Sequence, residues 1–106
     1  MKNITPKQLQ QYLTETDTAP LLLDVRENWE FEYCHIANSV LIPMGKLPDK
    51  LNELDRQKEI IIICHHGIRS RQMGYYMEQM GFEHIINLDG GVERWAEDVE
   101  PTMKRY

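Results

Sequence analysis

The chain has only two cysteines, Cys34 and Cys64, among its 106 residues. Two are too few for a disulfide scaffold or a four-cysteine zinc site, so we expect both to be free thiols in a reducing compartment. The chain also has no apolar run that approaches the length of a membrane span. Its first residues lack a basic region followed by an apolar stretch. We therefore expect a cytoplasmic protein that does not enter a membrane.

Positive charge is also scarce. The sequence holds 12 Lys and Arg against 17 Asp and Glu, a net charge of −5, which argues against general nucleic-acid binding. Hydrophobic residues make up 42% of the chain, as is typical of a globular protein, and there is no internal repeat or low-complexity segment. The length predicts one domain over residues 1–106, with a charged tail at about 99–106 that is loosely held.

Short apolar runs alternate with amphipathic segments along the chain. The runs at 21–23, 40–42, 59–63 and 85–88 predict strands. Thr5-Pro6, with Gln8 at the capping-box position, predicts the start of a helix, and further helices are expected over about 47–54, 70–80 and 92–97. Because the strands are continuous apolar runs between helices, they indicate an α/β domain with a parallel sheet covered on both faces.

Such a sheet places its functional sites at the carboxyl ends of its strands, and three candidate segments lie there: residues 24–26, 64–69 and 89–91. The second is the most informative, because Cys64 directly follows the apolar run 59–63 and a helix begins soon after it. Its sulfur would lie where backbone N–H groups and the helix dipole stabilise an anion. A thiol in that position is expected to exist largely as thiolate.

Four motifs, in order, resemble those of the rhodanese family of sulfurtransferases. Residues 24–27 (Asp-Val-Arg-Glu) resemble its first-strand signature, and 35–37 (His-Ile-Ala) the next segment, although Cys34 stands where a glycine usually precedes the histidine. Residues 64–70 (Cys-His-His-Gly-Ile-Arg-Ser) resemble the active-site loop Cys-x-x-Gly-x-Arg-Ser, and 88–91 (Leu-Asp-Gly-Gly) the closing signature. The resemblance covers residue 4 to about 96. It implies a stand-alone member with a three-layer α/β/α fold around a five-stranded, mainly parallel sheet.

The resemblance also implies a thiosulfate sulfurtransferase whose nucleophile is Cys64. The thiolate would attack the outer sulfur of thiosulfate, expel sulfite and keep a persulfide, whose terminal sulfur would pass to cyanide or a small thiol. Loop N–H groups would stabilise the anions, and Arg69 would receive the sulfonate end of thiosulfate. No cofactor is required. The expected substrate-binding residues are His65, His66, Gly67, Ile68, Arg69 and Ser70.

Some of these residues keep a second interpretation. Arg69 could be a solvated residue of the first helical turn. The rings of His65 and His66 either act on an anionic substrate or only line the loop, and the lining role is favoured. A metal ion on these histidines is not expected, because adjacent residues rarely chelate one ion and no further ligand cluster joins them in the sequence.

The residues that flank the loop are expected to be structural. Asp24 would accept N–H bonds from the loop after its strand, and Arg26 would pair with a carboxylate, for which Glu30 is the candidate. Cys34 is expected to pack as a small hydrophobe rather than to act as a resolving thiol. Asp89 and the two glycines after it would form a turn that borders the site.

The same residues bear on three other functions. A phosphatase or arsenate reductase of the cysteine-loop type is disfavoured, since those loops place five residues between cysteine and arginine and this one places four, which leaves less room for a tetrahedral phosphate. A non-catalytic binding module is disfavoured because the cysteine, glycine and arginine are all present. A protein-to-protein persulfide carrier is compatible with the sequence. Its donor would be a protein persulfide, or its acceptor a thioredoxin-like protein.

Overall fold

The computed structural model describes all 106 residues and contains one sheet of five strands, in which every neighbouring pair is parallel. The strand order is β1-β5-β4-β2-β3, which places β4 at the centre. The strands are β1 (Lys2–Ile4), β2 (Leu21–Asp24), β3 (Val40–Leu41), β4 (Ile60–Ile63) and β5 (Ile85–Leu88). Parallel neighbours end at the same edge of the sheet, so the residues after β2, β4 and β5 lie close together.

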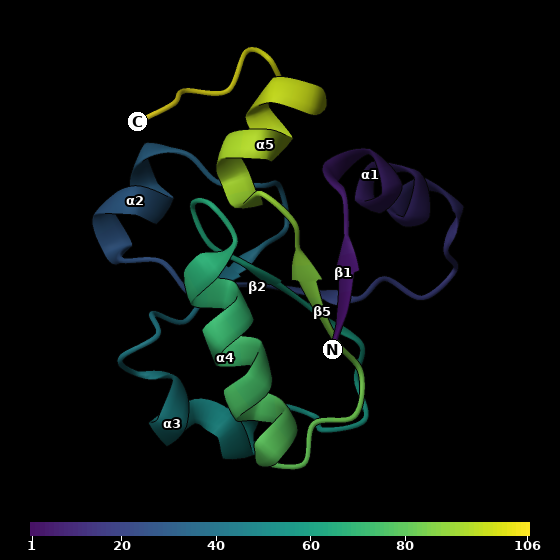
Figure 1. Cartoon of the computed structure of the whole chain (residues 1–106), viewed down its shortest axis with the longest axis vertical. Coiled ribbons are helices and arrows are strands. Elements are labelled where there is room, and N and C mark those ends of the chain that lie inside the picture. Colours follow the sequence, from purple (N-terminus) through teal and green to yellow (C-terminus); the bar gives the residue numbers. More distant parts are fainter.

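Helices connect consecutive strands and cover both faces of the sheet (Figure 1). The first begins as the capping box predicts, because Thr5 and Gln8 exchange backbone and side-chain hydrogen bonds at its start. The helices are α1 (Pro6–Glu15), α2 (Asn28–Tyr33), α3 (Leu47–Lys50) with a 3-10 turn (Leu51–Glu53), α4 (Ile68–Gln79) and α5 (Gly91–Asp98).

The central strand divides the hydrophobic core into two halves. Its four isoleucines are fully buried, and successive side chains point to opposite faces of the sheet. Ile60 and Ile62 pack in the half that holds buried residues of α3 and α4, and Ile61 and Ile63 pack in the half that holds residues of α1 and α5. This arrangement confirms the three-layer α/β/α fold expected from the sequence.

Several parts of the chain differ from the expectation, among them α2, since no helix was expected over residues 28–33. The strand β1 was not predicted, because Lys2-Asn3-Ile4 is short, mostly exposed and without an apolar run. The segment after α5, expected to be loosely held, turns back toward α2, as the yellow trace in Figure 1 shows. The hydroxyl of Tyr106 forms hydrogen bonds with Arg26 and Glu30. The segment is therefore attached to two buried residues near the carboxyl ends of the strands. None of the helices has the length and hydrophobicity needed to cross a lipid bilayer.

Candidate active site

Cys64 follows β4 directly and opens the loop that leads into α4. Gly67, the residue before that helix, has a φ of 95°, in the left-handed region that favours glycine. A Cβ at this position would lie 3.1 Å from Gly90 N, so a side chain has little room here either. The backbone of the loop therefore turns at Gly67, close to the residue that precedes α5.

The sulfur of Cys64 lies at the floor of this loop. The residue is only 1% exposed, Gly67 N–H donates a hydrogen bond to Sγ over 3.0 Å, and Ser70 Oγ lies 3.3 Å from Sγ. The other N–H groups of the loop donate to no acceptor in the protein: they belong to His65, His66, Ile68, Arg69 and Ser70. One amide thus contacts the sulfur, and the rest are available to an anion beyond it.

The carbonyl groups of the loop are held by the first turn of α5. Val92 N–H donates to Cys64 O over 2.9 Å, and Glu93 N–H donates to His65 O over 3.0 Å. Gly91 brings the two backbones together, since a Cβ there would lie 2.4 Å from Cys64 O. Because the carbonyls are bonded to α5, they do not compete with the N–H groups for the space around the sulfur.

Asn87 is a buried residue of β5 that no sequence motif points to. Its Oδ1 accepts a hydrogen bond from Ser70 Oγ, and its Nδ2 donates to Gly67 O over 3.4 Å and to Asn3 Oδ1 over 3.2 Å. Both Asn87 and Ser70 are 0% exposed. The available signal was an asparagine inside an apolar strand, because a buried polar group needs partners.

Arg69 forms a two-pronged ion pair with Glu30. Its Nη1 lies 2.7 Å from Oε1 and its Nη2 lies 2.8 Å from Oε2 of that carboxylate, which is 4% exposed. The hydrogen bonds from Arg69 hold the pKa of Glu30 at about 2. Arg69 is therefore not a solvated residue of the helix. Its charge is largely balanced by Glu30, a partner that the sequence did not indicate for it.

The partner predicted for Arg26 was wrong. Arg26, fully buried, donates from Nη2 to Asp24 Oδ2 over 2.8 Å and to Cys34 O over 2.7 Å, while Glu30 belongs to Arg69. The physical reason is that the Arg26 side chain folds back over its own strand end, where Asp24 is also buried. Asp24 Oδ1 accepts the backbone N–H of Arg26 over 3.0 Å, which confirms the role expected for that carboxylate.

The two histidines of the loop are stacked, with ring centroids 3.9 Å apart. The ring of His65 stacks on Tyr106 on its other side, also at 3.9 Å, and burial lowers the pKa of His65, which favours its neutral form at neutral pH. His66 and the first helical residue, Ile68, face solvent, the latter at 64% exposure. These positions support a lining role for His65 rather than that of a cation.

No further metal ligand was expected from the sequence beside these histidines, and Glu93 shows that this reason against a metal ion was wrong. Its Oε2 lies 3.4 Å from His65 Nε2, a buried nitrogen without a hydrogen bond. The possible ligand atoms of His65, His66 and Glu93 lie within 4.8 Å of one another, so a third ligand does join the pair. That carboxylate is already engaged, because Arg105 donates to its other oxygen and lowers the pKa of Glu93.

The remaining candidates lie where the sequence placed them. Cys34 is 8% exposed, has no disulfide and packs in the core half of α1 and α5, as expected of a small hydrophobe. Asp89 directly follows β5 and pairs with Arg94 over 2.9 Å. Gly90 and Gly91 have φ values of 75° and 58° and form the predicted turn, and Trp95 of α5 is buried in the core.

The chain as a whole matches one family of known proteins. A model of the rhodanese-like domain matches residues 5–98. The "Putative sulfurtransferase YtwF" of Bacillus subtilis (strain 168) is 35% identical over 101 residues, covering 95% of this chain and 96% of that protein. The "Thiosulfate sulfurtransferase GlpE" of Coxiella burnetii (strain RSA 331 / Henzerling II) is 33% identical over 75 residues, covering 71% of this chain and 70% of that protein.

A longer relative and a solved structure agree with this placement. The "Putative sulfur carrier protein YrkF" of Bacillus subtilis (strain 168) is 40% identical over 86 residues, which are 81% of this chain but 46% of that protein, so the match spans less than half of the relative. The crystal structure of a rhodanese-like domain protein from Staphylococcus aureus superposes with a TM-score of 0.85 at 33% identity, covering 93% of this chain and 95% of that chain.

Proposed function

Because the chain belongs to the rhodanese-like domain family of sulfurtransferases, we propose that it moves a sulfane sulfur from thiosulfate or a related donor to a thiophilic acceptor through a persulfide on Cys64. The observation that carries this proposal is the environment of the Cys64 sulfur. A backbone N–H contacts Sγ over 3.0 Å, and five further loop amides have no acceptor in the protein. Such a set of dipoles stabilises a thiolate, and then the longer persulfide anion.

The chemistry has two balanced steps. In the first, the Cys64 thiolate attacks the outer sulfur of thiosulfate, a sulfur–sulfur bond forms, the bond inside thiosulfate breaks, and sulfite leaves with the electron pair. In the second, a thiolate or cyanide attacks the terminal sulfur of the persulfide, and the Cys64 thiolate is regenerated. The covalent intermediate predicts ping-pong kinetics.

Arg69 would orient the donor rather than supply an unpaired charge. Glu30 takes two of its five N–H donors, and the remaining donors are available to the sulfonate oxygens of thiosulfate. Neighbouring loop amides would share that anion. We expect Arg69→Ala to lower kcat/KM for thiosulfate and, because it leaves the buried Glu30 carboxylate unpaired, also the free energy of unfolding. An unchanged kcat/KM would remove Arg69 from the proposed site.

A protein-to-protein sulfur carrier is the second candidate. One relative is named a sulfur carrier, and the depth of Cys64 in its loop favours a narrow sulfur-bearing group over a bulky donor. Cyanide, small thiols and a thioredoxin-like protein are all acceptors of suitable chemistry. A phosphatase is disfavoured, because Arg69 is paired with Glu30 and the loop leaves four residues between Cys64 and that arginine.

Mass spectrometry after brief exposure to thiosulfate tests the proposal. We expect the peptide that contains Cys64 to gain one sulfur atom, and Cys64→Ser to lose both the gain and the transfer of sulfur to cyanide. Cys34→Ala is the matched control, and we expect it to keep both, since Cys34 packs in the core. Loading from a protein persulfide but not from thiosulfate would establish the carrier. Full activity of Cys64→Ser, or Cys64-dependent turnover of an aryl phosphate, would contradict the proposal.

A further inference from the structure

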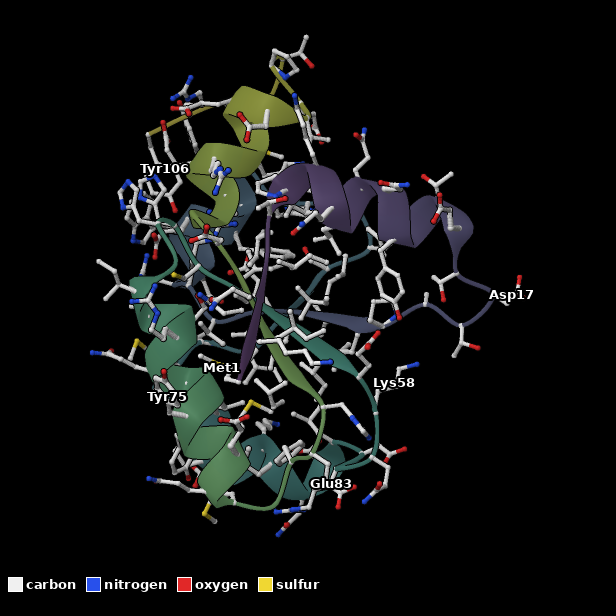
Figure 2. All side chains as sticks on the ribbon, turned by 45° about the vertical axis from the view of Figure 1, so that its right-hand side comes forward. Met1, Asp17, Lys58, Tyr75, Glu83 and Tyr106 are labelled. Carbon is white, nitrogen blue, oxygen red and sulfur yellow. The ribbon has the colours of Figure 1, made fainter.

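The segment after α5 brings Tyr106 onto the candidate site. In Figure 2, Tyr106 lies at the end of the molecule where α4 begins. Its ring stacks on His65 with centroids 3.9 Å apart, and meets Trp29 and Tyr33 edge to face at 5.3 and 5.8 Å. An aromatic side chain 42 positions beyond the cysteine (106 − 64) therefore forms one wall of the loop region.

The hydroxyl of Tyr106 bridges two buried charged groups. It donates to Glu30 Oε2 over 2.7 Å and accepts from Arg26 Nη1 over 2.8 Å. Arg26 is 0% exposed and Glu30 is 4% exposed, so both partners of this hydroxyl are shielded from bulk water. Burial raises the pKa of Tyr106, which keeps the hydroxyl protonated and able to donate.

This bridge closes a continuous chain of hydrogen bonds from the end of β2 to the active-site loop. Its members, in order, are Asp24, Arg26, Tyr106, Glu30 and Arg69. The chain determines where the Glu30 carboxylate sits. That carboxylate in turn determines the direction of the Arg69 donors that remain free.

We propose that Tyr106 is a positioning residue for anionic sulfur donors: its hydroxyl fixes Glu30, and through it Arg69, while its ring backs the imidazole of His65. The proposal rests on the proposed function, because it assigns a task to Arg69 at that same site. Tyr106 does not touch the reacting sulfur, and its effect passes through its two neighbours.

The residues before Tyr106 hold it in place. Arg105 pairs with Glu97 over 2.8 Å and with Glu93 on the same helix, α5. Lys104 lies over the ring of Tyr33, 5.8 Å from its centroid. The segment is thus attached to α5 and α2 on either side of the site, which keeps the Tyr106 hydroxyl directed at Glu30.

Kinetics of Tyr106→Phe test the hydroxyl separately from the ring. We expect KM for thiosulfate to rise about five-fold with kcat within about two-fold, the loss expected for one charge-assisted hydrogen bond that orients a binding group. Tyr33→Phe is the matched control: its ring contacts Tyr106, but its hydroxyl bonds nothing in the protein, so KM should not change. An unchanged or lower KM in Tyr106→Phe overturns the proposal.

Alkylation of Cys64 gives a second measurement that does not depend on sulfur transfer. Iodoacetate and iodoacetamide have nearly the same shape but differ in charge, so the ratio of their rates reports how well the site orients an anion. We expect Tyr106→Phe to lower this ratio about two- to five-fold while Tyr33→Phe leaves it unchanged. Rates that change equally for both reagents would assign Tyr106 a merely structural role and overturn the proposal.

The two measurements separate the two hypotheses. If the unmodified protein transfers no sulfur, the proposed function fails, and the alkylation ratio still decides the role of Tyr106. If it transfers sulfur and Tyr106→Phe matches it in both KM and alkylation ratio, only the positioning role fails. Because phenylalanine keeps the ring stacked on His65, this variant is expected to fold even if Tyr106→Ala does not.

Discussion

At the scale of single residues, the site depends on which carboxylate each arginine meets. Arg26 and Glu30 are four positions apart in sequence, which made them the natural pair, yet Arg69 takes Glu30 and Arg26 takes Asp24. The sequence motifs predicted that these residues would lie at or beside the candidate site. They could not predict their pairing, because that depends on how α2 and α4 meet in space, and this is set by packing across the sheet rather than by sequence spacing.

The pairing of Glu30 with Arg69 makes the free energy of unfolding depend on pH. Its pKa of about 2 lies below the ordinary value of 4.5, so its contribution is fully present above pH 4.5 and is lost as the pH falls toward 2. We expect the free energy of unfolding to drop by up to about 3 kcal/mol across that range. Glu30→Gln should be less stable at pH 7 and should lose less of its stability on acidification.

Urea denaturation at a series of pH values would measure this effect. Glu32→Gln is a suitable control, since Glu32 is an exposed carboxylate on the same helix, α2, and forms no ion pair. We expect that control to keep the acid-dependent slope of the unmodified protein. An equal slope in Glu30→Gln and in the unmodified protein would show that the Arg69 pair does not stabilise the fold.

At the scale of elements, the contact between α5 and the Cys64 loop is the one most sensitive to substitution. Gly91→Ala would place a Cβ 2.4 Å from Cys64 O in a residue with a φ of 58°. We expect a loss of about 2–4 kcal/mol in the free energy of unfolding, from backbone strain and overpacking together. Sulfur transfer should fall at least about ten-fold, because the loop carbonyls lose their donors in α5.

Gly45→Ala is the matched control for this substitution. Nothing lies within 4 Å of a Cβ at Gly45, so its stability and activity should stay within experimental error of the unmodified protein. Thermal unfolding and steady-state sulfur transfer would be compared for the two variants. Equal behaviour of the two would mean that α5 does not hold the loop.

Some elements could be predicted from sequence and others could not. The strands β2, β4 and β5 were predicted because continuous apolar runs report burial on both faces. The expected helix over 47–54 is a short α3 followed by a 3-10 turn, although its apolar spacing still buries Leu47 and Leu51. The strand β1 carries no pattern of its own, since it forms only by pairing with β5.

The candidate site shows the same division. The Cys64 loop was predicted from a local motif together with the strand and helix on either side of it. Asn87, Glu93 and Tyr106 were missed as partners of that loop because each reaches it from a separate segment. Only the fold brings those segments to the same edge of the sheet.

At the scale of the whole molecule, stability should decrease from the centre of the sheet outward. The central strand β4 is buried on both faces, whereas Val40 at the start of β3 is 47% exposed. We expect amides of β4 to exchange with deuterium only through global unfolding, and those of β3 to exchange through local opening. Native-state hydrogen exchange read by NMR would test this, and equal protection of the two strands would contradict it.

The two borders of the sheet, β1 with three residues and β3 with two, also bear on self-association. A neighbouring polypeptide that tried to add itself as a sixth strand would find too few unpaired peptide groups in either border for a stable ladder. The central strand β4, whose four isoleucines strongly favour β-structure, is thereby kept from pairing with strands of other molecules. The brevity of its margins protects the protein from growing into an aggregate as long as it stays folded.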